Sequence, residues 1–157
     1  MKNINKYINE RLHITSKQQY SCQPKTKDEL QKIIIKRIKS DGLECDLNDI
    51  DVSKIDDMSH LFDEFDKPGN DIFKYFNGDI SQWNVSNVKN MNKMFFMCNK
   101  FNCDISRWDV SNVETMEWMF YWCAEFNCDL SRWDVSNVKN MKYAFYLCST
   151  KPKWYKK

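Results

Sequence analysis

The chain is short of the residues that usually make turns, because its 157 residues include only 3 Gly and 3 Pro. Gly adopts positive φ without strain and Pro fixes φ, so both are the normal source of tight turns. Turns in this chain must therefore come from Asn, Asp and Ser, whose short polar side chains bond to nearby backbone. With only 2 His in the sequence, a zinc site with histidine support has few candidate ligands.

Long apolar runs are also missing from the sequence. No stretch approaches the roughly 18 apolar residues that a membrane-spanning helix needs. Residues 1–6 lack the apolar core of a signal peptide. We therefore expect a cytoplasmic protein, either in a bacterium or in an infected host cell, with no membrane partner.

Catalytic motifs are the third absence. The sequence contains no Gly-rich phosphate loop, no nucleophile elbow and no HExxH motif. Adjacent carboxylates such as Asp56 and Asp57 lie in an acidic stretch, which is more typical of a solvated surface than of acid–base chemistry. We expect a protein that is not an enzyme and that needs no cofactor.

What the chain does have is one 25-residue unit that occurs three times. The segment 76–88 returns as 101–113 and again as 126–138. A diverged fourth copy aligns at 47–55, and its larger offset places extra residues within 63–75, where Pro, Gly, Asn and Asp predict a surface loop. Repetition at a fixed period of this size indicates a repeat fold. Each full copy closes with Met, Phe and Cys: Met91, Phe95 and Cys98; Met116, Phe120 and Cys123; Met141, Phe145 and Cys148.

Each copy contains two different hydrophobic periods. The pattern Trp-x-Val-x-x-Val is short, β-branched and bounded by Asn, Asp and Ser, which predicts a strand. The pattern Met-x-x-Met-Phe-x-x-Cys has the spacing i, i+3, i+4, i+7, which predicts a short helix. We therefore predict an α/β repeat solenoid, leucine-rich-repeat-like, with one short strand and one short helix per repeat. Equivalent side chains should then stack in ladders: Trp83, Trp108 and Trp133; Phe95, Phe120 and Phe145.

Two helices are predicted upstream of the repeats. Apolar residues at 3–4 spacing predict a short helix over 3–14. Thr26 and Glu29 form a capping box before a second apolar stripe, and Gly42 provides its end. These helices would cover the exposed end of a repeat array, which otherwise leaves core open.

The chain therefore divides into three predicted parts. Residues 1–44 form a helical N-terminal cap, 45–150 form the four-repeat solenoid, and 151–157 form a basic C-terminal tail. Pro152 prevents easy continuation of a helix into the tail. Trp154 is expected to fold back over the last repeat and serve as a cap.

The repeat itself resembles a known family. The phrase Phe-Asn-x-Asp-Ile/Leu-Ser-x-Trp-Asp/Asn-Val-Ser-Asn-Val-x-x-Met recurs in register within residues 45–150 and resembles the BspA-like leucine-rich repeats of bacterial surface proteins. Similar repeats occur in mycoplasma lipoproteins and in gut bacteriophage proteins. The resemblance implies protein–protein interaction rather than catalysis. Surface members carry export signals or anchors and are longer, so a short chain without such a signal is more similar to a phage protein acting inside a bacterium.

The cysteine and aspartate repeats each allow more than one role. The chain has 7 Cys, and an odd count without a signal peptide argues against a disulfide framework. Buried core packing, a metal site and redox use remain open for them, and core packing is favoured. The recurring Asp79, Asp104 and Asp129 fit acceptors for turn backbone better than a calcium site, since calcium-binding repeats also need several Gly. We therefore predict no metal.

Aromatic residues outside the predicted core stripe are the main candidates for a partner-binding surface. They become denser toward the last copies, and Tyr and Trp are enriched in interface cores. The alternative is that these side chains are core or lie beneath the tail. The candidates are Trp118, Tyr121, Trp122, Tyr143 and Tyr146, with Phe96 in the earlier copy. A second candidate surface follows the predicted strands at Arg107, Asp109, Arg132 and Asp134.

Charge is segregated along the chain. Residues 1–42 hold 10 basic and 4 acidic side chains, whereas 43–150 hold 10 basic and 18 acidic ones, and the tail 151–157 adds 4 Lys. An acidic repeat region disfavours bulk binding of nucleic acid. We therefore expect an interaction module, such as a phage-encoded inhibitor or adaptor that binds a host protein. The alternatives are a structural protein that self-associates, and an acidic mimic of nucleic acid.

Overall fold

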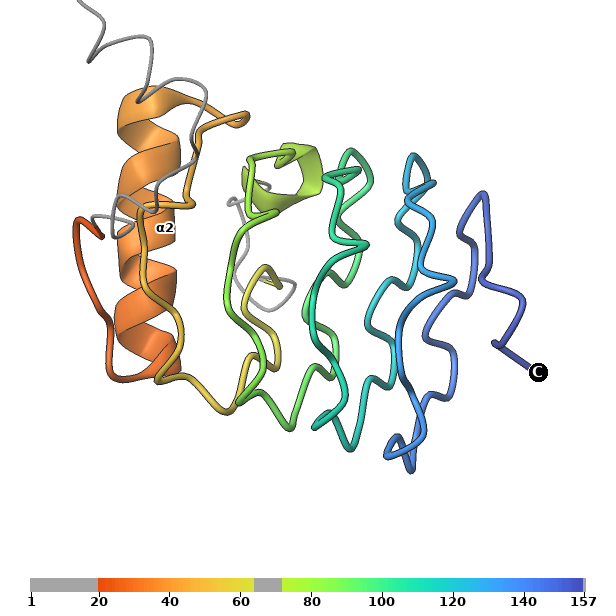
Figure 1. Cartoon of the computed structure of the whole chain (residues 1–157). Helices are drawn as coiled ribbons and strands as arrows, with labels where there is room; N and C mark the ends of the chain where they lie inside the picture. The colour runs from red at the N-terminus through yellow and green to blue at the C-terminus, as the bar shows by residue number, and fades with distance from the viewer. Residues whose placement is uncertain (1–19, 64–71, 157) are drawn as a thin grey trace, which may run out of the picture.

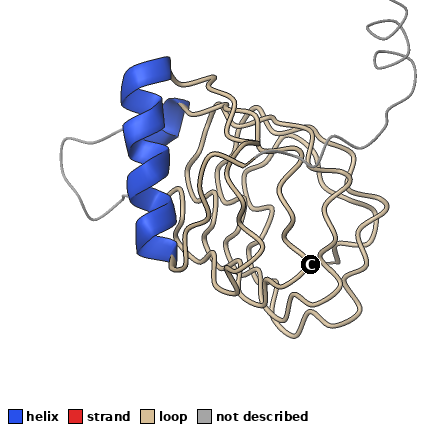
Figure 2. Ribbon diagram, turned by 60° about the vertical axis from the view of Figure 1, so that its left-hand side comes forward, coloured by secondary structure: helices blue, strands red, loops and turns tan. Residues whose placement is uncertain are grey.

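The computed structural model describes residues 20–63 and 72–156. Within these residues there is one α-helix, α2 (Lys27–Asp41), and one 3-10 helix, η1 (Ile72–Tyr75), and no strand (Figure 2). The helix predicted over 3–14 lies outside the described residues. So does most of the loop predicted within 63–75.

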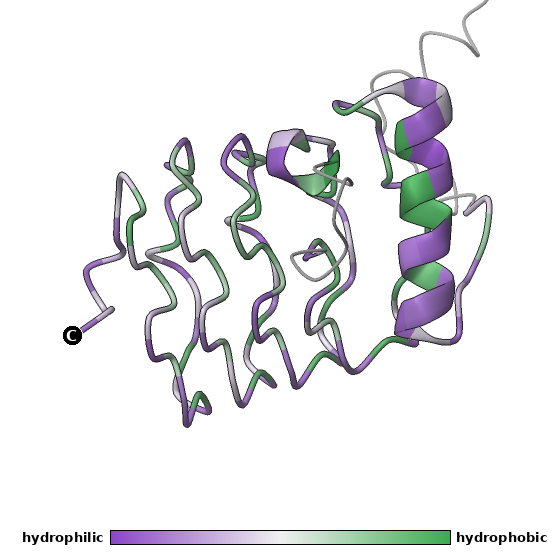
Figure 3. Cartoon of the chain, turned by 180° about the vertical axis from the view of Figure 1, so that it is seen from behind, coloured by the Kyte–Doolittle hydropathy of each residue, from purple (hydrophilic) through white to green (hydrophobic). Residues whose placement is uncertain are grey.

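Helix α2 begins and ends where its capping residues predict. The Thr26 hydroxyl accepts a hydrogen bond from the Glu29 N–H at 3.2 Å, and the Glu29 carboxylate accepts one from the Lys25 N–H at 2.8 Å. Gly42 ends the helix at φ 96°, a conformation that favours Gly. Hydrophobic and hydrophilic residues alternate around α2 (Figure 3), and its buried residues are Leu30, Ile34 and Ile38.

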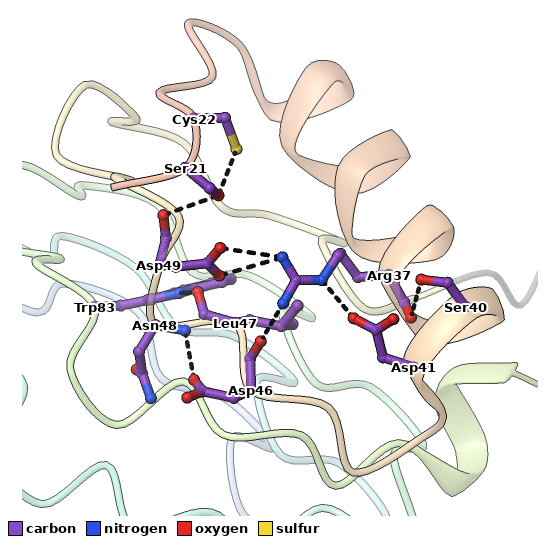
Figure 4. A network of polar contacts seen from close by, with 10 residues as sticks. All are labelled: Ser21, Cys22, Arg37, Ser40, Asp41, Asp46, Leu47, Asn48, Asp49 and Trp83. Carbon is purple, nitrogen blue, oxygen red and sulfur yellow. Dashed lines mark hydrogen bonds and ion pairs between the residues drawn. The ribbon is translucent and has the colours of Figure 1, made fainter. Parts of the chain in front are cut away.

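Hydrogen bonds and ion pairs from polar side chains join α2 to the first repeat. The Arg37 guanidinium donates to the Asp49 carboxylate at 3.1 Å and to the Asp46 carbonyl at 2.9 Å (Figure 4). The Gln31 amide donates to the Leu61 carbonyl at 2.9 Å, and Lys27 pairs with Asp57 at 3.1 Å. Because these contacts accompany a buried apolar stripe, α2 closes the N-terminal end of the repeat region.

The repeats follow one another side by side along the molecule, from the helix at one end to the C-terminus at the other (Figure 1). Isolated parallel bridges join equivalent positions, pairing Asn90 with Thr115 and Thr115 with Asn140. Backbone N–H groups at alternate residues donate to the carbonyls of the next repeat, for example from Met91 to Thr115 at 2.9 Å. The connection between neighbours is thus single hydrogen bonds, not extended strand pairing.

The predicted fold class is therefore wrong. An α/β repeat solenoid, leucine-rich-repeat-like, would have a strand and a short helix in each repeat. The described repeats have neither, and consist of consecutive tight turns joined by isolated bridges.

The residues expected to form short helices form two consecutive tight turns instead, here called the double turn. Within 91–98, the N–H groups of Met94 and Cys98 donate to carbonyls three residues earlier, and Lys93 and Met97 have positive φ of 53° and 61°. A residue with positive φ cannot continue a right-handed helix. Two turns of this kind place apolar side chains at the same i, i+3, i+4, i+7 spacing as a helix, so the period alone could not separate them.

The residues expected to form strands are interrupted by side-chain hydrogen bonds. The Asn84 side-chain oxygen accepts from the Ser86 N–H at 3.2 Å, which removes a donor that a strand would use. Another tight turn follows at once, where the Val88 N–H donates to the Val85 carbonyl at 2.9 Å. The chain thus follows Asn, Asp and Ser turns, as its shortage of Gly and Pro requires.

The predicted role of the aspartate series in these turns is confirmed. Asp79, Asp104 and Asp129 each accept from the N–H of a Ser two residues later, at 2.9–3.0 Å. A separate series of Asn side chains, which recurs once per repeat, links neighbouring repeats. The side-chain amides of Asn112 and Asn137 donate to serine carbonyls of the preceding repeat at 2.8 and 2.6 Å. Both series therefore satisfy turn backbone.

Rows of stacked aromatic rings fill the interior. Phe95 lies 5.2 Å from Phe62 and 5.4 Å from Phe120, and its ring is nearly parallel to both. Trp83 and Trp108 stack at 6.4 Å with an angle of 3° between their planes. The predicted Phe ladder is present in full, since Phe120 also stacks on Phe145 at 5.2 Å, and the Trp ladder is present between Trp83 and Trp108. Both belong to one continuous core with the apolar face of α2.

The end of the chain folds back onto the last repeat as expected. The Trp154 indole N–H donates to the Leu130 carbonyl at 2.8 Å, which continues the series in which Trp108 and Trp133 donate to carbonyls of the preceding repeat. The rings of Trp154 and Tyr155 lie 5.7 and 5.1 Å from Phe145. A tail residue thus takes the place that the Trp of a further repeat would occupy.

Candidate functional site

The double turn in each repeat decides which side chains reach the surface. Met116, Met119 and Phe120 are fully buried, whereas Trp118 and Tyr121, which lie between and beside them, point away from the core. Each Trp or Tyr at the first outward position has positive φ, 59° at Trp118 and 57° at Tyr143. The same backbone geometry recurs in every repeat, so the outward residues form columns.

The outward rings touch one another across three repeats. Phe96 stacks on Tyr121 at 5.0 Å, and Tyr121 stacks on Tyr146 at 5.4 Å, with nearly parallel planes. A second column packs against the first, because Trp118 lies 4.9 Å from Tyr121 and 4.6 Å from Tyr143. We call these five residues, Phe96, Trp118, Tyr121, Tyr143 and Tyr146, the aromatic face.

The aromatic face is solvent-exposed at its C-terminal side. Tyr146 is 46% exposed and Tyr143 38%, while Trp118 and Tyr121 are half-buried by their neighbours. Four of the predicted partner-binding residues are therefore brought together on one surface and are not core. Trp122, the fifth, is 46% exposed, but its ring is in contact with no other aromatic ring of the described residues.

Lysine side chains border the aromatic face. The Lys93 ammonium lies 5.4 Å from the centre of the Phe96 ring, and the Lys142 ammonium lies 5.0 Å from that of Tyr143. A cation over an aromatic ring is attracted by the ring's electron density. The face is therefore apolar at its centre and positively charged along its edge.

A groove of about 300 Å³ continues the aromatic face at the C-terminal end. Sequence reasoning placed the tail over the last repeat but missed the groove and its lysines, because repeat spacing does not assign side-chain positions in the tail. The Trp at 154, which mimics the repeat Trp, was the available signal. The groove is lined by Met141, Lys142, Tyr143, Tyr146, Lys151, Tyr155 and Lys156.

The second predicted surface is built differently. Arg107, Asp109, Arg132 and Asp134 are all exposed, and within the described residues neither Arg forms an ion pair. The Asp109 carboxylate accepts hydrogen bonds from the hydroxyl and the N–H of Ser111, which hold its pKa below the usual value. The aspartates of this surface thus shape turns.

The cysteines line the core and bond to backbone. The thiols of Cys98 and Cys123 donate to the carbonyls of Phe62 and Phe95 at 3.3 and 2.9 Å. Burial raises the pKa of both thiols well above its ordinary value, and raises the pKa of Cys103 to about 12. Among residues 20–63 and 72–156, no group of three or more His, Cys, Asp or Glu is arranged as a metal site.

These features define a repeat protein built from turns, with an aromatic face on its surface. The chain belongs to the family described as "Mycoplasma protein of unknown function, DUF285", whose model matches residues 34–155. This match supports the mycoplasma part of the predicted resemblance and does not specify BspA-like repeats. No curated protein and no solved structure matched the chain. No helix in the described part has the length and apolar character needed to cross a membrane.

Proposed function

We propose that the protein is a non-enzymatic interaction module that binds another protein through the aromatic face. The observation that carries this proposal is the continuous contact of five surface rings across three repeats. Contiguous exposed apolar surface is uncommon on proteins that have no partner. Tyr and Trp are also the residues that most often dominate binding energy at interfaces.

The stacking of these rings favours tight binding. Tyr121 is held between Phe96 and Tyr146 and against Trp118, so its rotamer is already fixed before a partner arrives. Fixing a side chain on binding costs about 0.5–1.5 kcal/mol, and a preformed face avoids much of this cost. The lysines at its edge would add attraction to a partner with acidic groups around an apolar patch.

The finer identity of the module is part of the same proposal. The resemblance to BspA-like repeats, which also occur in bacteriophage proteins, supports an inhibitor or adaptor that acts on a host protein in the cytoplasm. The absence of any catalytic motif from the sequence supports a role by binding alone.

The experiment compares variants on the same partner. The tagged protein is used to capture partners from a nuclease-treated bacterial lysate, and the recovered protein is then titrated against the variants Tyr146→Ala and Trp118→Ala. We expect each to weaken binding roughly tenfold or more, because a central aromatic residue of an interface contributes on this scale. Trp122→Ala tests whether the contact extends beyond the five rings.

Tyr75→Ala is the matched control. Tyr75 is also 46% exposed, and it contacts none of the rings of the aromatic face in the described structure. Its removal should leave affinity unchanged. Equal binding by the wild type, Tyr146→Ala and Trp118→Ala, with unchanged melting temperatures, would exclude the aromatic face as the contact surface.

A further inference from the structure

The last repeat leaves a row of backbone donors open. In every earlier repeat, N–H groups at alternate residues of the double turn donate to carbonyls of the next repeat. The N–H groups of Trp118 and Trp122, for example, donate to the carbonyls of Lys142 and Tyr146 at 3.0 and 2.8 Å. The equivalent N–H groups of the last repeat have no hydrogen-bond acceptor among the described residues. They belong to Met141, Tyr143 and Leu147, and to Phe145, which is fully buried and packs against the rings of Trp154 and Tyr155.

Along the double turn, this edge offers donors rather than acceptors. The carbonyls of Met141, Tyr143 and Phe145 already accept turn hydrogen bonds at 3.0, 3.1 and 3.4 Å from N–H groups three residues later. An open row of backbone groups is a template for a further chain segment. Because the open groups of the double turn are N–H groups, this part of the edge favours a segment that presents carbonyl oxygens at alternate residues.

Positive charge surrounds the same edge. Met141 and Tyr143, which carry two of the open N–H groups, also line the groove of about 300 Å³. Three lysines, Lys142, Lys151 and Lys156, line it as well, and no acidic residue is among its lining. The groove therefore pairs an apolar aromatic wall with cations, which complements an acidic ligand.

We propose that this edge binds an extended acidic peptide segment of another protein. Every second carbonyl of an extended segment points to the same side, so alternate carbonyls can accept from the open N–H groups. Carboxylates of the segment then pair with Lys142, Lys151 and Lys156. The inference rests on the proposed interaction function, and it names the chemistry of the partner.

A second copy of the chain is a poor occupant of the edge. The carbonyls at the opposite end of the repeats are covered by α2, whose Gln31 amide donates to the carbonyls of His60 and Leu61 at 3.3 and 2.9 Å. Two C-terminal ends brought together at their double turns would place N–H donors against N–H donors and lysines against lysines. A heterologous partner satisfies both the hydrogen bonds and the charge.

Amide hydrogen exchange of the full chain tests the edge directly. In the free protein, the amides of Met141, Tyr143 and Leu147 should exchange faster than those of Trp118 and Trp122, which are hydrogen-bonded. The probe is a synthetic eight-residue peptide of alternating Glu and Val, with a Gln-for-Glu peptide as the neutral control. The acidic probe should slow exchange at the open amides and bind at least about tenfold more tightly than the neutral one.

Charge-reversal variants show whether the acidic probe is attracted by the lysines of this edge or by the net charge of the whole protein. The double variant Lys142→Glu/Lys151→Glu should weaken the acidic probe about tenfold or more, because two attractions become repulsions. The control Lys32→Glu/Lys36→Glu makes the same charge change on exposed residues of α2 and should bind the probe within about twofold.

Several results would overturn the inference. Equal affinity for the acidic and neutral peptides would exclude recognition of acidic side chains at this edge. So would an equal loss of affinity for the acidic peptide in both double variants. Tighter binding of oligothymidylate than of the acidic peptide would assign the edge to a phosphate backbone, and concentration-dependent dimerisation through the edge would assign it to a second copy. If Trp118→Ala releases a captured partner while no acidic peptide binds, this inference fails and the aromatic-face proposal stands. If neither occurs, both fail.

Discussion

The indole hydrogen bonds between repeats give the sharpest test of what holds the fold together. Trp108 is 4% exposed, and its N–H donates to the Ile80 carbonyl of the preceding repeat at 3.2 Å. The substitution Trp108→Phe keeps an aromatic ring in the stack with Trp83 but removes this donor. The buried carbonyl of Ile80 then keeps the turn hydrogen bond from the Trp83 N–H at 3.1 Å and loses its second one.

The expected loss can be estimated from two effects. Because the carbonyl stays hydrogen-bonded to the Trp83 N–H, losing the indole bond costs about 0.5–1.5 kcal/mol, the net contribution of one hydrogen bond. The smaller ring leaves a void in a close-packed stack, which adds roughly 1 kcal/mol. We therefore expect Trp108→Phe to reduce the free energy of unfolding by about 1.5–2.5 kcal/mol.

Trp154→Phe is the matched control, because Trp154 makes the same bond to the Leu130 carbonyl at 2.8 Å from a half-buried position at the end of the chain. Water can replace its indole there, so the loss should be about 1 kcal/mol. Urea unfolding followed by circular dichroism measures both values, with unchanged slope as the sign that the unfolded state is unaltered. A loss below about 0.5 kcal/mol for Trp108→Phe, or a larger loss for Trp154→Phe, would refute the reasoning.

Three further substitutions test the turns. Gly78→Ala should lower stability by about 1–3 kcal/mol in urea unfolding, because its Cβ would lie 2.7 Å from the Cys45 carbonyl oxygen. Trp118→Gly should be about 1 kcal/mol more stable than Trp118→Ala, since residue 118 has positive φ; calorimetry showing Ala more stable would contradict this. The pKa of Asp109 is lowered by hydrogen bonds from Ser111, so its contribution is present above the unfolded pKa and is lost as pH falls through the folded one. Asp109→Asn should therefore flatten the decline of melting temperature in acid, and an unchanged acid decline would refute this.

Much of the interior could be predicted from the repeat, because burial depends on which positions recur and not on their secondary structure. Phe95 and Cys98 are buried whether the chain forms a helix or two tight turns. The helix α2 could be predicted in full, since Thr26 and Gly42 define its ends by local chemistry. The fold class could not, because Lys93 and Met97 adopt positive φ without being Gly. Hydrogen bonds to neighbouring repeats stabilise that backbone, and these contacts are nonlocal.

The candidate site was predictable to the extent that it consists of recurring positions. Trp118, Tyr121, Tyr143 and Tyr146 follow the repeat period, so their grouping could be expected once neighbouring copies were stacked. Whether they would be exposed depended on the direction in which each turn points its side chains. The groove is formed partly by the tail, whose sequence does not follow the repeat pattern. The residues that line the groove could therefore not be assigned from repeat spacing.

Charge and open backbone donors together are consistent with a partner at one end of the molecule only. The repeat region 43–150 carries 18 acidic and 10 basic side chains, so it repels an acidic segment over most of its length. Positive charge lies toward both ends of the sequence, since residues 1–42 hold 10 basic and 4 acidic side chains and the tail adds 4 Lys, but only the tail end also has the open backbone donors. At the other end, α2 covers the carbonyls with Gln31 and binds Asp49 with Arg37. An acidic segment is therefore attracted to the one edge that can also hydrogen-bond to it. Raising the salt concentration should weaken the electrostatic attraction between the segment and the lysines more than it weakens the backbone hydrogen bonds.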